Sequence, residues 1–199
     1  MKITSIQTQV KNAGRYSVFV EGKYAFSLSA DALLESRLVS GQELSDGDIV
    51  HFKKLSAEDK AFNLTLAYVA RRMRSEGELA DYFRRKEYAP ELAGQIMERL
   101  RKLGFVDDEE FARRWVENRR MLRSSSAKKL RLELRQKKIA DDTIDTILAE
   151  DETDERQLLR DLVAKKRKQS RYQDDQKLMA YLARQGFTYD DIKNALSSD

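Results

Sequence analysis

The chain repeats one spacing of apolar residues three times, and this repetition limits the folds that it can adopt. In each copy an apolar residue is followed by a second after four positions and by a third after five more. Residues four apart share one face of a helix, so each copy predicts a buried helix that ends in a tight turn. The copies begin 51 and 48 residues apart, a period that is typical of helical repeat arrays. They are Leu79, Phe83 and Tyr88; Leu130, Leu134 and Ile139; and Leu178, Leu182 and Phe187.

Polar residues at a fixed position mark the start of the middle helix in each copy. Ser75, Ser126 and Asp174 each lie four residues before the first apolar residue, and such side chains cap helices by accepting a backbone hydrogen bond. Amphipathic segments on both sides of each middle helix predict a first and a third helix. We therefore expect three three-helix repeats over residues 56–106, 107–151 and 152–199.

The first 55 residues differ from the repeats because they begin with a stretch in which apolar residues alternate with polar ones. Alternation over residues 1 to about 28, with turns at 11–15 and 21–23, predicts a three-stranded antiparallel meander. Ser29 is placed to cap a short helix, and Ser45 with Asp48 forms a capping box that begins the next one. The expected fold is thus mainly α: a tandem array of three three-helix repeats preceded by a small antiparallel β-rich subdomain over residues 1–55.

A second capping pattern, Ser56 followed by Asp59, predicts a helix boundary at the junction of this subdomain and the first repeat. We expect an amphipathic helix to begin there and to run to about Arg72, with Leu64 among its buried residues. The first repeat is counted from this boundary.

The composition removes most enzymatic chemistry. The 199 residues include no cysteine and one histidine, His51, which excludes disulfides, thiolate catalysis and thiol–imidazole pairs. No glycine-rich phosphate loop occurs, and the acidic runs at residues 107–110 and 150–155 lack the glycine and the ligand spacing of an EF-hand. We therefore expect no catalytic residue, no cofactor and no metal.

Signals for membrane insertion are also missing from the sequence. It contains neither a run of about 18 apolar residues nor a signal-peptide core behind Met1. No large apolar face is left over once the repeats are packed. We therefore expect a cytoplasmic monomer that does not contact membranes.

The net charge of +4 conceals a strong segregation of charge along the chain. Residues 119–138 contain nine lysines and arginines against one glutamate, whereas residues 141–155 contain eight carboxylates and no basic residue. Each block alone is consistent with a solvated helix face, but basic residues recur near the start of each middle helix. Such a discontinuous track fits a polyanion, or an acidic groove on a protein bound to one. The candidate contacts are Arg71, Arg72, Arg74, Arg123, Lys128, Lys129, Lys165, Lys166, Arg167 and Arg171.

Two motifs resemble those of the RecX family of recombination regulators. One is the turn RMRSEGEL at residues 72–79, and the more specific one is the junction LGFVDDEEFA at residues 103–112. The β-rich leader is also similar to that of many members, so the resemblance covers essentially the whole chain. The family usually has glycine before the residue that closes the middle helix, and this chain keeps it only at Gly186, with Glu87 and Lys138 in the other repeats.

The resemblance implies a non-enzymatic protein that binds the RecA–single-stranded DNA filament. By lying along the helical groove of the filament, it would bridge neighbouring RecA protomers and inhibit or modulate ATP hydrolysis, strand exchange and filament extension. It would reach single-stranded DNA directly or through RecA.

Two other functions stay open at this point. One is a sequence-independent DNA-binding helical repeat protein that acts without RecA, whose affinity for DNA should fall steeply with salt. The other is an enzyme, for which the sequence supplies no nucleophile paired with a catalytic base and no cofactor loop.

Overall fold

The computed structural model describes residues 1–10, 12 and 14–197 of the chain. Within this part it contains three β-strands, ten α-helices and one short 3-10 helix, which confirms the prediction of a mainly helical chain with a small antiparallel sheet near its N-terminus. The chain divides into two compact units. The first comprises Met1–Arg72 and Pro90–Ile96, and the second comprises Met73–Ala89 and Met97–Asp199.

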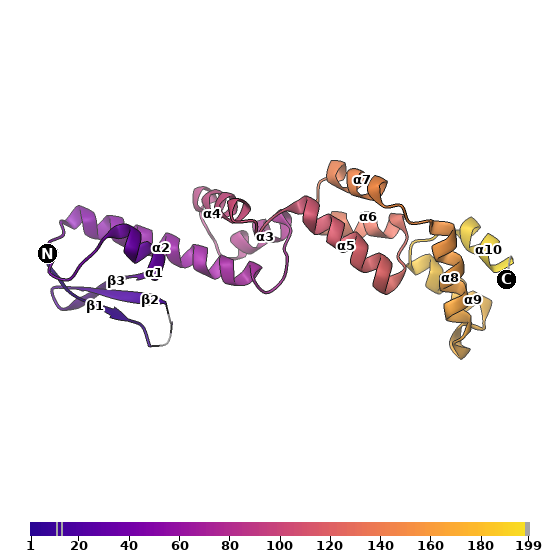
Figure 1. Ribbon diagram of the computed structural model, residues 1–199, viewed down its shortest axis with the longest axis horizontal. Helices are drawn as coiled ribbons and strands as arrows, with labels where there is room; N and C mark the ends of the chain where they lie inside the picture. The colour runs from indigo at the N-terminus through magenta and orange to yellow at the C-terminus, as the bar shows by residue number, and fades with distance from the viewer. Residues whose placement is uncertain (11, 13, 198–199) are drawn as a thin grey trace. The chain divides into compact units, whose positions relative to one another are not determined.

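The first unit contains the sheet and the two helices that cover it (Figure 1). Its elements are β1 (Ile3–Thr8), β2 (Arg15–Val20), β3 (Lys23–Ser29), α1 (Ala30–Ser36) and α2 (Asp46–Val69). Antiparallel pairing joins β1 to β2 and β2 to β3, which confirms the meander, although the turn predicted at residues 11–15 includes two positions outside the described residues. Successive strand side chains point to opposite faces, so the apolar ones gather on one face and form a core with α1 and α2.

Helix α2 is a single helix, and the predicted helix start at Ser56 is wrong. Both residues of that capping pattern fasten the interior of α2 to the sheet. Ser56 donates its hydroxyl to the Ser27 carbonyl at 2.6 Å, and Asp59 accepts from the Arg15 guanidinium at 2.8 Å and from the Ser29 backbone N–H at 2.9 Å. Partners from distant strands therefore decide the role of side chains whose local spacing is that of a cap.

The other predicted caps are confirmed. Each one accepts a hydrogen bond from a backbone N–H in the first turn of its helix, and together they are Ser29, Ser45, Ser75, Ser126 and Asp174. The burial predicted for Leu64 is wrong, since this side chain is 47% exposed on the outer face of α2.

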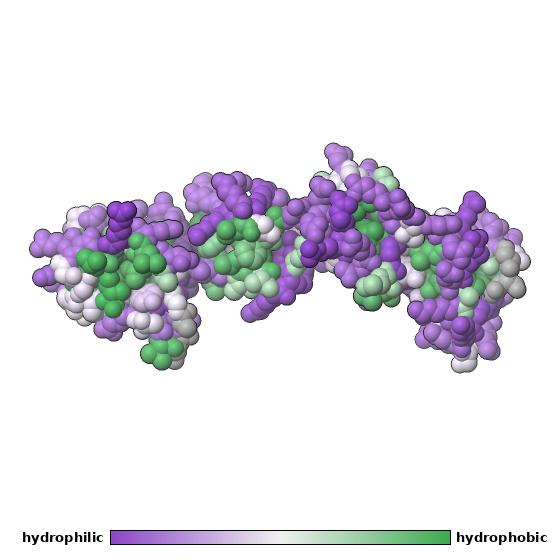
Figure 2. Space-filling view, in the orientation of Figure 1, coloured by the Kyte–Doolittle hydropathy of each residue, from purple (hydrophilic) through white to green (hydrophobic). Residues whose placement is uncertain are grey.

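The repeats are formed by α2 and the helices that follow it. These are α3 (Glu76–Arg85), α4 (Pro90–Lys102), α5 (Asp108–Arg123), α6 (Ala127–Gln136), α7 (Asp141–Glu150), α8 (Glu155–Arg167), the 3-10 helix η1 (Ser170–Tyr172), α9 (Asp175–Arg184) and α10 (Tyr189–Ser197). In Figure 1, α5 to α7 form one group and α8 to α10 the next. Each group buries its own apolar core, as the repeated spacing predicted. Figure 2 shows mainly hydrophilic residues on the visible surface of these helices, with hydrophobic ones between them.

Consecutive repeats are joined end to end through their middle helices. At the first joint, Ser75 at the start of α3 donates its hydroxyl to the Lys137 carbonyl at the end of α6, at 2.6 Å. At the second joint, Ser126 at the start of α6 donates its backbone N–H to the Gln185 carbonyl at the end of α9, at 3.0 Å. At each joint the residue that caps one helix donates a hydrogen bond to a free carbonyl at the end of another, so each joint satisfies a carbonyl that a helix alone leaves unpaired.

The turns that close the three middle helices share one backbone conformation. Glu87, Lys138 and Gly186 have φ angles of 55°, 61° and 93°, all in the left-handed region that favours glycine. The two repeats that lack the glycine therefore keep the same turn.

Candidate nucleic-acid interface

Four basic side chains predicted as contacts lie together at the second joint. Arg123 ends α5, Lys129 lies in the first turn of α6, and Lys165 and Lys166 lie in the last turn of α8. We call these four residues the cationic cluster. Three of them line one pocket of about 280 Å³, and Lys129 is tied to the same pocket by a hydrogen bond of 3.0 Å from its ammonium to the side chain of Gln185.

Helix ends bring these charges together. Helix α5 ends where Ser124 adopts a left-handed conformation with φ 49°, immediately after Arg123. Helix α8 ends within the basic run 165–168. A helix C-terminus carries partial negative charge that stabilises basic residues in its last turn. Two such C-terminal turns line the same pocket, so the positive side chains accumulate there.

The pKa of the Lys129 ammonium is lowered from its ordinary value. Burial is the main cause that lowers the pKa of Lys129, and the nearby charges of Arg123 and Arg119 lower it further. Glu133 opposes this shift, but its carboxylate is already bound by Arg119 at 2.6 Å and by the indole N–H of Trp115 at 2.9 Å. A bound anion would relieve the repulsion among these cations.

The cluster has charge available for a ligand. Arg123 and Lys165 are exposed and have neither a hydrogen bond nor an ion pair within the described part of the chain. The ammonium of Lys166 lies 4.7 Å from the ring centroid of Tyr181 and 5.4 Å from that of Tyr172, contacts that leave its positive charge uncompensated by an anion. Basic and aromatic side chains in one place are the components with which proteins bind single-stranded nucleic acids.

Three other predicted contacts on these helices are arranged differently. Lys128 is exposed in the first turn of α6 but does not line the pocket. Arg167 points its guanidinium to Asp175, at 2.6 Å, so an internal carboxylate already neutralises it. Arg171 lies in η1 with its guanidinium carbon 5.8 Å from the ring centroid of Tyr172.

The three arginines predicted at the turn between α2 and α3 are not part of the cationic cluster. Arg71 and Arg72 are exposed and belong to the first unit, whereas Arg74 is half-buried and belongs to the second. A direct contribution of these residues to binding stays a prediction.

Two pocket residues, Tyr181 and Gln185, were missed in the sequence. Tyr181 lies on α9 and Gln185 caps the C-terminal end of that helix, and both line the pocket together with residues of α5 and α8. Their place beside Arg123 depends on the stacking of the second repeat on the third, which no local pattern reports.

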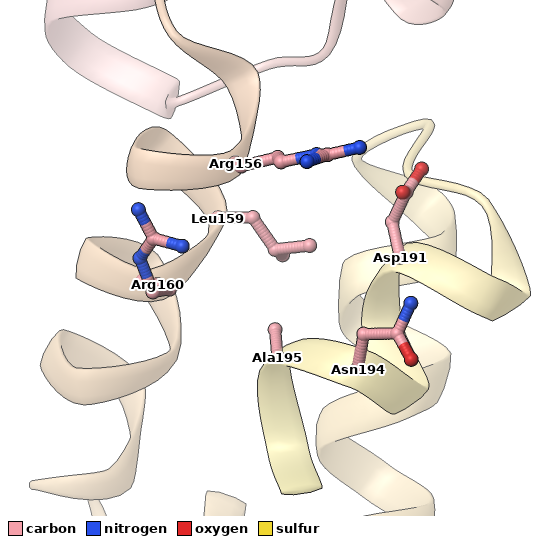
Figure 3. Close-up of a pocket in the computed structure, with 6 residues that line it drawn as sticks. All are labelled: Arg156, Leu159, Arg160, Asp191, Asn194 and Ala195. Atoms are coloured by element: carbon pink, nitrogen blue, oxygen red, sulfur yellow. The ribbon is translucent and has the colours of Figure 1, made fainter. Parts of the chain in front are cut away.

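A second basic pocket, within the third repeat, was also missed (Figure 3). Arg156 and Arg160 on α8 face Asp191 on α10 across a cavity of about 280 Å³, and Leu159 lies between the two arginines. The spacing of the two arginines by four residues was the available signal, since it places them on one helix face. The carboxylate of Asp191 opposes an anion in this cavity, so the cationic cluster is the better anion site.

The acidic runs have structural roles. Asp107 caps α5 by accepting the Glu110 N–H at 2.9 Å, and Asp108 accepts the Glu76 N–H at 2.8 Å while burial raises its pKa. Asp151 in the second run is bound by Arg120. Among the described residues no group of histidine and carboxylate side chains is arranged to hold a metal ion, and no helix there is long and apolar enough to cross a bilayer.

Known proteins match the chain along nearly its entire length. Models of the RecX family match in four segments: the N-terminal domain of regulatory protein RecX at residues 1–45, and the first, second and third RecX three-helix domains at residues 61–100, 107–148 and 153–196. The chain is 36% identical to regulatory protein RecX of Bacillus subtilis (strain 168), over 98% of this chain and 75% of that protein. It is 34% identical to the RecX of Bacillus pumilus (strain SAFR-032), over 98% of this chain and 76% of that protein.

Solved structures show the same fold. A crystal structure of regulatory protein RecX aligns with a TM-score of 0.74 at 27% identity and covers 98% of both chains. A crystal structure of RecX from Lactobacillus salivarius aligns with a TM-score of 0.59 at 22% identity, over 71% of this chain and 95% of that one. Because the four matched domains follow one another in the order of the sheet and the repeats, and the sequence similarity spans almost every residue, this chain belongs to the RecX family of regulatory proteins.

Proposed function

We propose that this protein binds the RecA–single-stranded DNA filament along its groove and inhibits or modulates its ATP hydrolysis, strand exchange and extension. The observation that carries the proposal is the cationic cluster, in which Arg123 and Lys165 lack a partner in the described part of the chain. The names of the relatives, which are regulatory proteins, support a regulatory role without catalysis. We further propose that it acts as a monomer in the cytoplasm.

In this proposal the cationic cluster binds phosphate groups. An arginine and lysines around one pocket can each contact a phosphate oxygen and displace its counterion, which gives affinity without reading the sequence of bases. A protein held in this way along the filament groove would bridge RecA protomers and hinder the changes that accompany ATP hydrolysis. Arg71, Arg72, Arg74, Lys128 and Arg171 would extend the contact.

A second candidate function is direct DNA binding without RecA. The same cluster favours it, because nothing in phosphate recognition requires a recombinase. The two functions differ in the component that is needed for tight binding.

The deciding experiment is a titration of RecA ATPase on single-stranded DNA with this protein at two salt concentrations. The test variant is Arg123→Glu/Lys165→Glu, and its matched control is Lys53→Glu/Lys60→Glu, which makes the same charge change at exposed lysines of α2. We expect wild type and control to suppress the ATPase activity when fewer than one molecule of this protein is present per RecA molecule. The cluster variant should need about tenfold more protein for the same suppression.

Other results would separate the candidates. No effect on RecA, together with salt-sensitive binding of a single-stranded oligonucleotide by the wild type, would replace filament regulation with plain DNA binding. Equal suppression by the cluster variant and the control would remove the cationic cluster from the mechanism.

A further inference from the structure

A groove in the second repeat shares no lining residue with the pocket of the cationic cluster. Its volume is about 590 Å³, roughly twice that of the pocket in the cluster. Helix α5, helix α7 and the segment that follows α7 form its walls. The lining residues used below are Val116, Glu117, Met121, Ile147, Glu150 and Glu152.

The groove has an apolar base and an apolar edge. Val116 and Ile147, which are 4% and 3% exposed, belong to the core of the repeat and form the base. Met121 is 75% exposed, and Figure 2 shows a small hydrophobic patch at the C-terminal end of α5, where Leu122 is also exposed. A flexible, polarisable methionine side chain adapts to different apolar partners.

The positive charges of the groove are already neutralised. Arg113 is ion-paired to Glu109 at 3.2 Å and also to Glu150. Arg120 is bound by Asp151 at 2.6 Å and by Glu155 at 2.9 Å. Neither guanidinium is therefore left for an anionic ligand.

Two negative charges remain at the groove. Glu117 and Glu152 are exposed, and within the described residues neither has a hydrogen bond or an ion pair. Their carboxylates would repel a phosphate and attract an ammonium or guanidinium group. The groove thus has the opposite electrostatic preference to the cationic cluster.

We propose that this groove binds a segment of a partner protein in which lysine or arginine side chains flank apolar ones. The apolar side chains would cover Met121 and the base at Val116 and Ile147, and the basic ones would pair with Glu117 and Glu152. Charge complementarity selects this occupant, because the unpaired groups at an apolar groove are all carboxylates. The inference concerns a surface that the proposed function does not use and does not depend on RecA.

The experiment uses the full chain and two synthetic amphipathic peptides with the same leucine face, one flanked by lysines and the other by glutamates. Methyl-labelled methionine gives a spectrum of five methyl groups, in which Met121→Leu identifies the signal at the groove. The test variant is Glu117→Lys/Glu152→Lys. Glu35→Lys/Glu43→Lys makes the same charge change at two exposed carboxylates of the first unit and is the control.

We expect the lysine peptide to shift the Met121 methyl signal and the glutamate peptide to leave it in place. The groove variant should bind the lysine peptide about tenfold more weakly than wild type, and the control variant should bind like wild type. An unmoved Met121 signal, or equal affinity of the groove variant and the control, would overturn the inference.

Two further results would also overturn it. A Met121 shift caused by a single-stranded oligonucleotide would assign the groove to nucleic acid, and a shift that depends on protein concentration alone would assign it to a second copy of the chain. RecA takes no part in the peptide test, so its result is independent of the ATPase titration.

Discussion

Gly77 and Lys138 meet at the first joint, where only one of the two can carry a side chain. A Cβ added at Gly77 would lie 2.3 Å from the Cβ of Lys138. The second joint has the reverse arrangement, because Gly186 has the left-handed turn and its added Cβ would lie 2.3 Å from the Ser126 hydroxyl. Each joint therefore contains one glycine, at the helix start in the first and at the helix end in the second.

Gly77→Ala should lower the free energy of unfolding by about 1–3 kcal/mol, although alanine usually stabilises a helix relative to glycine. Adding Lys138→Gly should restore stability, since it removes both the clashing side chain and a left-handed strain of about 1 kcal/mol. Urea denaturation of the two single variants and the double variant measures this coupling. Gly94→Ala is the control, because no atom lies within 4 Å of its added Cβ in helix α4, and equal stability of Gly77→Ala and Gly94→Ala would contradict the prediction.

Residue-scale features were predictable where they depend on the residue's own backbone. The caps at Ser75 and Ser126 are such features, as is the turn at Lys138, whose position matches Gly186 in the repeat register. The requirement for glycine at position 77 was not predictable, because it comes from a side chain in the next repeat.

The carboxylate of Asp59, in the middle of helix α2, binds the helix to the sheet. The side chains of Arg15 and Asp59 are 15% and 7% exposed, and Asp59 also accepts hydrogen bonds from Ser29. Asp59→Asn should lower the free energy of unfolding of the first unit by about 3 kcal/mol, because it leaves the Arg15 charge unpaired in a largely buried site. Thermal unfolding monitored by circular dichroism measures the loss.

The control for this prediction is the neighbouring Glu58→Gln. The Glu58 carboxylate lies 3.8 Å from the ammonium of Lys54, and the Lys54 side chain is exposed. Exposed pairs contribute little, so this change should leave the thermal midpoint nearly unchanged. Equal midpoints for the two variants would show that the buried pair does not fasten α2.

The segment after α7 should make stability depend on acid pH. Burial alone would raise the pKa of Asp151, but hydrogen bonds from Thr153 and Arg120 outweigh it and lower this pKa. The folded chain then binds the proton less readily than the unfolded chain, whose carboxyl has a pKa of about 3.9. The stabilisation is present above that value and is lost as the pH falls through the lowered pKa.

From about pH 5 to about pH 3, the thermal midpoint of wild type should therefore fall more steeply than that of Asp151→Asn, which should already be less stable at neutral pH. Other carboxyls titrate in both proteins, so the difference between the two slopes isolates Asp151. Parallel slopes would be the contrary result.

Elements were predicted where periodicity alone defines them, and misread where a polar residue has a distant partner. The apolar spacing gave the middle helices and their buried residues. Ser56 and Asp59 matched the pattern of a helix start, yet strands β2 and β3 supply their partners. Three carboxylates of the run at residues 150–155, those of Glu150, Asp151 and Glu155, are likewise bound by arginines of α5.

Across the second unit, the joints connect cores that are otherwise separate. The second repeat contributes to both joints, through Lys137 to the first and through Ser126 to the second. In repeat arrays, stability is approximately the sum of what each unit contributes and what each neighbouring interface contributes. Loss of the second repeat should therefore weaken its neighbours.

Leu134→Asp tests this coupling, because Leu134 is 0% exposed and an unpaired carboxylate there would unfold the second repeat. Hydrogen exchange should show lost protection from α5 to α7 and reduced protection in α3 and α9, while the sheet of the first unit keeps its protection. Leu132→Asp is the control, since Leu132 lies on the same helix and is 57% exposed. Unchanged exchange in α9 of the Leu134 variant would contradict the coupling.

The sequence predicted the site as a set of charges but not as a shape. Of the ten candidate contacts, the four in the cationic cluster come together because α5, α6 and α8 end or begin at one joint. Repeat register placed basic residues near each joint. It could not show that Asp175 would form an ion pair with Arg167, because that contact depends on the turn through η1.

The opposite placement of the two glycines bears on how such an array can change during evolution. Duplicating the middle repeat would bring its own helix end, with Lys138, against its own helix start, where neither side has a glycine. Deleting it would leave Gly77 facing Gly186, with a gap where a side chain is needed. Either event therefore requires a compensating substitution at the new joint, so a repeat of this array cannot be duplicated or deleted without a further change in the sequence.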